Sequence, residues 1–157
     1  MSSRQISIAV DAMGGENSPL KVLKGIEIFK NEVQNAELKL FGEKELIIST
    51  IKKHNIKINS LEIINTTDNV KDDDNPNTIL RSRKKSSMYK GLEFVKNNSN
   101  SGFVSAGNTA AIMILSRLLI GMIKDVDRPA ICSLIPNKKN FSIMLDLGAN
   151  VTVNASN

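Results

Sequence analysis

Apolar and polar residues follow one another along this chain in two different rhythms. Short apolar runs bounded by polar residues or glycine predict strands, whereas apolar residues spaced three or four apart predict helices. The runs that predict strands lie at 6–10, 36–41, 61–64, 102–104, 130–135 and 141–145. The helical spacing covers 19–29, 43–53, a stretch from 76 onward, 87–95 and 110–123.

Two of these helices carry finer predictions. Ser18 is expected to cap the first helix, with Pro19 as its first residue, because proline suits the first helical position. In the second helix the spacing places Leu46, Ile47 and Ile51 on the buried face.

The order of the elements predicts the fold class. Strands that alternate with helices indicate an α/β domain in which a largely parallel sheet is covered by helices on both faces, giving three layers. With 157 residues, of which 41% are apolar and 24% charged, the chain is long enough for one domain with a core. We therefore expect a single domain over 1–157.

Three predicted turns have the same character: each follows a strand, and each is small, polar and glycine-bearing. They are 11–17, 105–109 and 146–150. The carboxyl ends of parallel strands meet at one edge of a sheet, where ligands bind, so we expect the three turns to converge there. The sequence has neither a complete G-x-G-x-x-G motif nor a P-loop, and a nucleotide site is not indicated.

The turn Ser105-Ala106-Gly107-Asn108-Thr109 joins a predicted strand to a predicted helix. The first N–H groups of a helix attract anions, and a glycine lets a ligand approach the backbone closely. The same serine, asparagine and threonine residues also serve as ordinary helix N-caps. The anion-binding and capping interpretations therefore both stay open.

Other candidate chemistry is weaker. The net charge of +5 fits an acidic partner, but aromatic residues total only 4%, which argues against nucleic-acid binding. Lys71-Asp72-Asp73-Asp74 lacks the glycine turn and distal glutamate of a calcium loop, so we expect a solvated acidic loop and no metal. His54 is expected to be a solvated residue at a helix end, and Cys132 a reduced thiol in the core.

The chain contains no segment that predicts membrane insertion or export. The N-terminal residues lack the apolar core of a signal peptide, and the longest apolar stretch, 110–123, is interrupted by Ser116 and Arg117. We therefore expect a cytoplasmic protein.

Six short motifs together carry a family likeness. They are Asp11-Ala12-Met13-Gly14-Gly15, Asp74-x-Pro76, Lys84-x-Ser86-Ser87-Met88, Ser105-Ala106-Gly107-Asn108-Thr109, Asp127-Arg128-Pro129-Ala130 and Leu145-Asp146-Leu147-Gly148-Ala149-Asn150. In this order they resemble the PlsX family of phosphate acyltransferases. The likeness runs from Ile6 to Asn150 and covers only the first part of the family's usual length.

The resemblance implies transfer of a fatty acyl group from acyl carrier protein to inorganic phosphate, which gives an acyl phosphate for phospholipid synthesis. It also implies an isocitrate or isopropylmalate dehydrogenase-like fold, here the N-terminal portion of a longer one, and no cofactor. A homodimer that associates peripherally with the cytoplasmic side of a membrane is expected. In this reaction phosphate is itself the nucleophile, so no serine or cysteine nucleophile is needed.

The resemblance, placed on the three turns, implies the following roles. Asn108, Asp146 and Asn150 are the candidate catalytic residues. Residues expected to bind substrate are Asp11, Gly14, Gly15, Ser105, Gly107 and Thr109. Candidates for docking the acidic carrier protein are Arg81, Arg83, Lys84 and Lys85, for which a solvated helix face is the alternative.

Two other functions stay open at this point. One is a phosphotransacetylase-like enzyme that uses coenzyme A thioesters in place of acyl carrier protein. The other is a remnant or interaction module that keeps the fold without turnover.

Overall fold

The computed structural model describes residues 6–33, 36–71, 74, 79 and 81–147. The chain divides into two compact units, Met1–Ile120 and Gly121–Asn157. The single domain expected over 1–157 stays a prediction.

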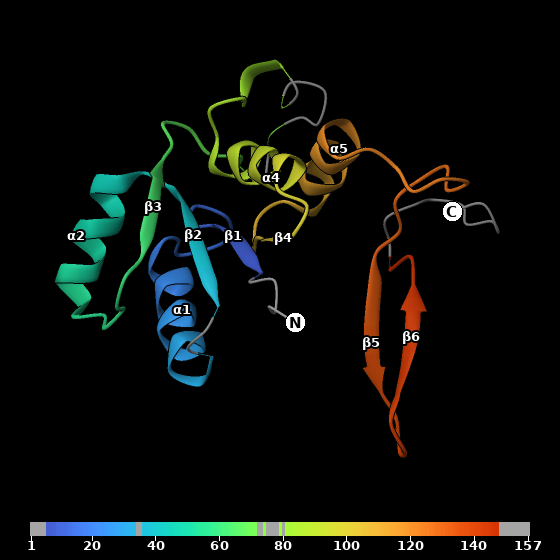
Figure 1. Ribbon diagram of the computed structural model, residues 1–157, viewed down its shortest axis with the longest axis horizontal. Helices are drawn as coiled ribbons and strands as arrows, with labels where there is room; N and C mark the ends of the chain where they lie inside the picture. The colour runs from blue at the N-terminus through green and yellow to red at the C-terminus, as the bar shows by residue number, and fades with distance from the viewer. Residues whose placement is uncertain (1–5, 34–35, 72–73, 75–78, 80, 148–157) are drawn as a thin grey trace. The chain divides into compact units, whose positions relative to one another are not determined.

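The first unit is built on a parallel sheet. Its strands are β1 (Ser7–Asp11), β2 (Glu37–Gly42), β3 (Glu62–Asn65) and β4 (Ser101–Val104). They lie in the order β3-β2-β1-β4, and every neighbouring pair is parallel (Figure 1). The predicted α/β class with a parallel sheet is therefore confirmed.

Helices α1 (Leu20–Glu32) and α2 (Lys44–His54) follow β1 and β2 in the chain. Alternate strand residues point to opposite faces of a sheet. Val10 and Leu40 belong to a buried cluster with Leu23 of α1 and Ile47 of α2, so these two helices pack on the same face.

Helix α4 (Ser87–Asn97) covers the opposite face of the sheet. The ring of Phe94 lies 5.9 Å from that of Phe41, the neighbour of Leu40 in β2. Gly91 of α4 faces Phe103 of β4 so closely that a Cβ atom there would stand 2.4 Å from the ring. Helices thus cover both faces, as the sequence predicted.

Helix α5 (Thr109–Leu119) packs against α4 through Ala111, Leu115 and Leu119. It ends four residues before the predicted Ile123. The C-cap is Ile120, and Gly121 follows with φ of +93°, a left-handed conformation that ends helices. The sequence pattern did not predict this helix end because the apolar run continues beyond Leu119.

The second unit contains an antiparallel two-stranded ribbon of β5 (Cys132–Pro136) and β6 (Phe141–Leu145). Both predicted strands are present. The prediction that Cys132 is a core thiol is wrong, because the residue is exposed. The apolar residues around Cys132 belong to a ribbon and not to a buried strand. Large side chains of this ribbon, including those of Ile143 and Leu145, are exposed.

Two finer predictions in the first unit are also wrong. Ser18 does not cap α1: Pro19 occupies the cap position, and the Ser18 hydroxyl donates a hydrogen bond to the carbonyl of Gly14. The buried face predicted for α2 is wrong for Leu46 only, which is 38% exposed, because Ile47 is fully buried and Ile51 packs against the same cluster.

Candidate functional site

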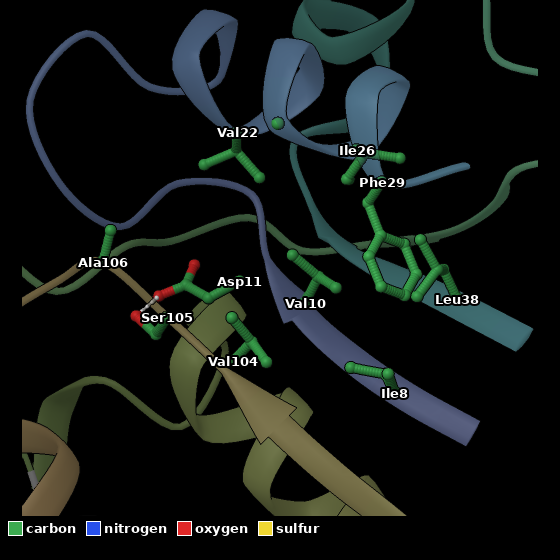
Figure 2. Close-up of a pocket in the computed structure, with 11 residues that line it drawn as sticks. Ile8, Val10, Asp11, Val22, Ile26, Phe29, Leu38, Val104, Ser105 and Ala106 are labelled. Atoms are coloured by element: carbon green, nitrogen blue, oxygen red, sulfur yellow. Dashed lines mark hydrogen bonds between the residues drawn. The ribbon is translucent and has the colours of Figure 1, made fainter. Parts of the chain in front are cut away.

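Two of the three polar turns meet in the structure. Asp11 closes β1 and Ser105 follows β4, and these two strands are parallel neighbours. The Ser105 hydroxyl donates a hydrogen bond to Asp11 Oδ2 over 2.8 Å, and Figure 2 shows the two side chains turned toward each other. Asp11 is only 2% exposed, so this hydrogen bond joins the two turns on the side that faces away from solvent.

A short chain of hydrogen bonds fixes the shape of this junction. The Gly107 N–H donates to Ser105 Oγ at 3.0 Å, and the Met13 N–H donates to Asp11 Oδ1 at 3.0 Å. A serine hydroxyl carries one proton. Asp11 accepts that proton in this arrangement, so the Ser105 hydroxyl links the Asp11 carboxylate to the backbone of the second turn.

The glycine pair after β1 allows the two turns to touch. A Cβ atom on Gly14 would lie 2.6 Å from Asp11 Oδ2, 2.7 Å from Ser105 Oγ and 2.8 Å from the Gly107 nitrogen. Gly15 has φ of +86°, and its Cβ would lie 2.7 Å from the Ala106 carbonyl oxygen. No other residue fits at either place without displacing the backbone of the second turn.

The second turn also begins helix α5. Asn108 is the N-cap, and its Oδ1 accepts a hydrogen bond from the Ala111 N–H at 3.0 Å. The capping interpretation of Asn108 is therefore confirmed. It satisfies one of the four N–H groups that lack a partner inside the helix, and it leaves those of Thr109 and Ala110 without an intrahelical acceptor.

Thr109 and Ala110 are both exposed, and the first turn of α5 contains no acidic residue. The positive end of the helix dipole therefore faces solvent with no carboxylate from its own first turn. Chemically this is a position at which an anion such as phosphate gains two backbone donors and a favourable field.

The third turn belongs to the second unit. Asp146 follows β6 with φ of +57°, and its N–H donates to the Ile131 carbonyl at 2.6 Å. Asn150 lies outside the described residues. The expectation that this turn joins the other two stays a prediction.

The basic cluster proposed for carrier docking contains one residue with a different function. Arg83 forms ion pairs with Asp68 at 2.9 Å and with Asp74 at 2.7 Å, and these side chains are only 24%, 25% and 14% exposed. Hydrogen bonds from Arg83 hold the pKa of Asp74 below its usual value. Arg83 thus ties the loop before α4 together, while Arg81, Lys84 and Lys85 remain exposed.

This network corrects the prediction of a fully solvated acidic loop at Asp74, because its carboxylate is largely buried against Arg83. Asp72 and Asp73 lie outside the described residues. Sequence reasoning missed the network because Arg83 is 9 residues from Asp74 and 15 residues from Asp68, and no local periodicity pairs residues at these separations. The one available signal was an arginine and two aspartates within 16 residues.

The described part of the chain contains no group of three or more histidine, cysteine or carboxylate residues that could hold a metal ion. None of its helices is long and apolar enough to cross a bilayer.

Comparison with known proteins decides the family. The family model described as "Fatty acid synthesis protein" matches residues 6–157. This chain belongs to that family. Among curated members of similar sequence is the phosphate acyltransferase of Pelagibacter ubique, which is 42% identical over 155 residues, or 99% of this chain and 46% of that protein.

Other fatty acid synthesis family members give the same result. The phosphate acyltransferase of Wolbachia pipientis wMel is 40% identical over 98% of this chain and 46% of its own length. That of Ehrlichia ruminantium is 38% identical over 96% of this chain and 45% of its own length. The chain therefore spans about half the length of the curated relatives that it matches, and the likeness to phosphate acyltransferases drawn from six motifs is confirmed.

Proposed function

We propose that this protein transfers a fatty acyl group from acyl carrier protein to inorganic phosphate. The observation that carries the proposal is the junction of the two turns, where the Gly14-Gly15 backbone approaches the exposed N-terminus of α5. The relatives named phosphate acyltransferase supply the reaction class. The phosphate would bind to the Thr109 and Ala110 N–H groups.

The chemistry places modest demands on such a site. A phosphate oxygen attacks the thioester carbonyl carbon, a C–O bond forms, the C–S bond breaks, and the thiolate leaves and takes up a proton. The protein has to hold two reactants in line and to stabilise the negative charge that develops on the carbonyl oxygen. Orientation and preorganised N–H donors can each contribute several kcal/mol to this.

The predicted site residues divide into two groups under this proposal. Asp11, Gly14, Gly15, Ser105 and Gly107 shape the wall and hold the turn in place, as their hydrogen bonds and close contacts support. In the second group, Thr109 with Asn108 would contact the phosphate directly, and Asp146 with Asn150 would orient phosphate or a proton on it.

The partners follow from the same proposal. Arg81, Lys84 and Lys85 are exposed and form the surface that we propose for the acidic carrier protein, since rim charges speed and orient association. Arg83 supports this surface through Asp68 and Asp74. A homodimer in the cytoplasm with peripheral membrane association, and an isocitrate or isopropylmalate dehydrogenase-like fold for the whole protein, complete the proposal.

The test compares two acyl donors side by side. The protein at its full natural length is supplied with an acyl carrier protein thioester or a coenzyme A thioester, with and without phosphate, and thiol release is measured. We expect phosphate-dependent release that is faster with the carrier protein. Preference for coenzyme A would support the phosphotransacetylase alternative, and release that ignores phosphate, or none at all, would support a non-catalytic protein.

A further inference from the structure

An apolar groove of about 340 Å³ runs along one face of the sheet and ends at the junction of the two turns. Figure 2 shows Val22, Ile26 and Phe29 of α1 on one side of it, and Ile8, Val10 and Val104 of the strands on the other. At its polar end lie Asp11, Ser105 and Ala106. The groove and the proposed phosphate site thus share one turn of the chain.

The groove lies between α1 and the sheet, beside strand β4. Among the described strands β4 is at the edge next to β1, and its Val104, which lines the groove, is 56% exposed. Gly25, at the centre of α1, lines the groove without a side chain, and a Cβ atom placed there would meet nothing within 4 Å. A side chain placed at Gly25 would therefore enter open space beside α1.

We propose that this groove binds the alkyl part of the acyl substrate, with the reacting head group at the Ser105–Thr109 turn. The proposal rests on the proposed function and names where the chain of the transferred acyl group lies. The side chains that line the groove are aliphatic or aromatic, except at the end where the head group would be. The polar side chains, those of Asp11 and Ser105, lie at that end. A linear chain with one polar end matches that distribution.

The size of the groove is compatible with such a ligand. Small-molecule sites usually have volumes of roughly 300 to 1,000 Å³ and an apolar lining with a few polar groups at one place. Burial of each additional methylene should tighten binding by about fourfold, because about 0.8 kcal/mol is gained for each group removed from water. Affinity should therefore rise with alkyl length until the groove is full.

The experiment titrates the protein at its natural length with inorganic phosphate and with ethyl, butyl, hexyl and octyl phosphate. Dissociation constants come from calorimetry, and the methyl NMR signals of Ile8, Val22 and Val104 report on the groove. We expect octyl phosphate to bind at least tenfold more tightly than ethyl phosphate and to shift those methyl signals. Equal affinity for all four alkyl phosphates would overturn the proposal. This is also the result expected if another segment of the protein covers the groove, and it would overturn the proposal in that case as well.

Gly25→Leu provides the decisive variant, because leucine favours helix and fills the groove from α1. We expect octyl phosphate to lose its advantage over ethyl phosphate in this variant while inorganic phosphate binds as before. Gly25→Ala controls for the gain in helix propensity and Lys24→Leu for an added leucine on α1 outside the groove; both should keep the length dependence. Retention of that dependence in Gly25→Leu would contradict the proposal.

The two hypotheses fail separately in this design. If inorganic phosphate does not bind but octyl phosphate still shifts the methyl signals, the phosphate site is contradicted and the alkyl groove is supported. If inorganic phosphate binds but affinity does not depend on alkyl length, the phosphate site is supported and the alkyl groove is contradicted.

Discussion

The two units of this chain differ most in how they bury their apolar residues. In the first unit, Leu23, Leu40 and Ile47 are fully buried between the sheet and the helices. In the ribbon of the second unit, Ile143 and Leu145 are each 64% exposed. Similar runs of apolar residues are therefore buried in the core of the first unit and exposed in the ribbon of the second unit.

The comparison shows what a strand needs in order to contribute to stability. A parallel strand in the first unit is covered by helices on its faces, whereas a two-stranded ribbon has marginal stability by itself. The polar turns of the first unit are joined to each other and to that covered sheet by hydrogen bonds and close contacts. Folding stability should therefore be sensitive to changes in the core of the first unit and much less sensitive to changes at the exposed side chains of the ribbon.

The largest expected effect is a core truncation. Leu40→Ala should lower the free energy of unfolding by about 2–5 kcal/mol, because it removes buried methyl groups and leaves a cavity in the centre of the sheet. Leu145→Ala in the ribbon should change it by less than about 0.5 kcal/mol. Urea denaturation of both variants measures this, and equal losses would remove the contrast between the two units.

The next effect concerns the contact between the two turns. Gly14→Ala should cost about 1–3 kcal/mol, because the new methyl group would overlap Asp11, Ser105 and the Gly107 nitrogen. It should also abolish phosphate binding. Gly102→Ala in β4 is the matched control, since a Cβ atom there meets nothing within 4 Å. A Gly14→Ala protein of unchanged stability and phosphate affinity would show that the two turns do not depend on their close approach.

Arg83→Ala should cost about 1 kcal/mol at neutral pH, since its ion pairs with Asp68 and Asp74 are only partly exposed. The folded-state pKa of Asp74 is lowered, so its contribution is present above the ordinary carboxyl pKa and is lost as pH falls through the folded-state value. The difference between Arg83→Ala and the unaltered protein should therefore shrink in acid.

Thermal unfolding from pH 7 down to pH 2 measures this dependence. Lys84→Ala, which removes an exposed neighbouring charge, is the control and should have little effect on stability. A stability difference for Arg83→Ala that stays constant across this range would contradict the assigned ion pairs.

The smallest expected change in stability comes from Asn108→Asp. Aspartate caps a helix as well as asparagine does, so the fold should be almost unaffected. Its negative charge should repel phosphate and raise the phosphate concentration needed for half-saturation by about tenfold or more. Asn108→Leu should lose both the cap, at about 1 kcal/mol, and phosphate dependence. An unchanged phosphate saturation curve in both variants would reject a role for Asn108 in binding.

Much of the first unit could be predicted from the sequence because its signals are local. Alternation located β1, helical spacing located α2, and the small turns after β1 and β4 followed from composition. The engagement of Ser105 by Asp11 depends on a contact across 94 residues, which no local pattern contains.

The errors have related physical causes. Cys132 was placed in a core because its run is apolar, yet burial depends on what covers a strand. The end of α5 depended on the left-handed conformation of Gly121 and not on hydropathy. Arg83 was expected either to dock a partner or to lie on a solvated helix face, because its two aspartates are 9 and 15 residues away in the chain.

The most direct test of a phosphate site at the two turns is an NMR titration of the ¹⁵N-labelled protein with inorganic phosphate. We expect the amide signals of Gly14, Gly15, Thr109 and Ala110 to shift together and to give one dissociation constant. Amides at the far end of α2, near His54, should stay unchanged. If those four signals do not move, or if shifts occur only at Arg81, Lys84 and Lys85, the two turns do not form a phosphate site.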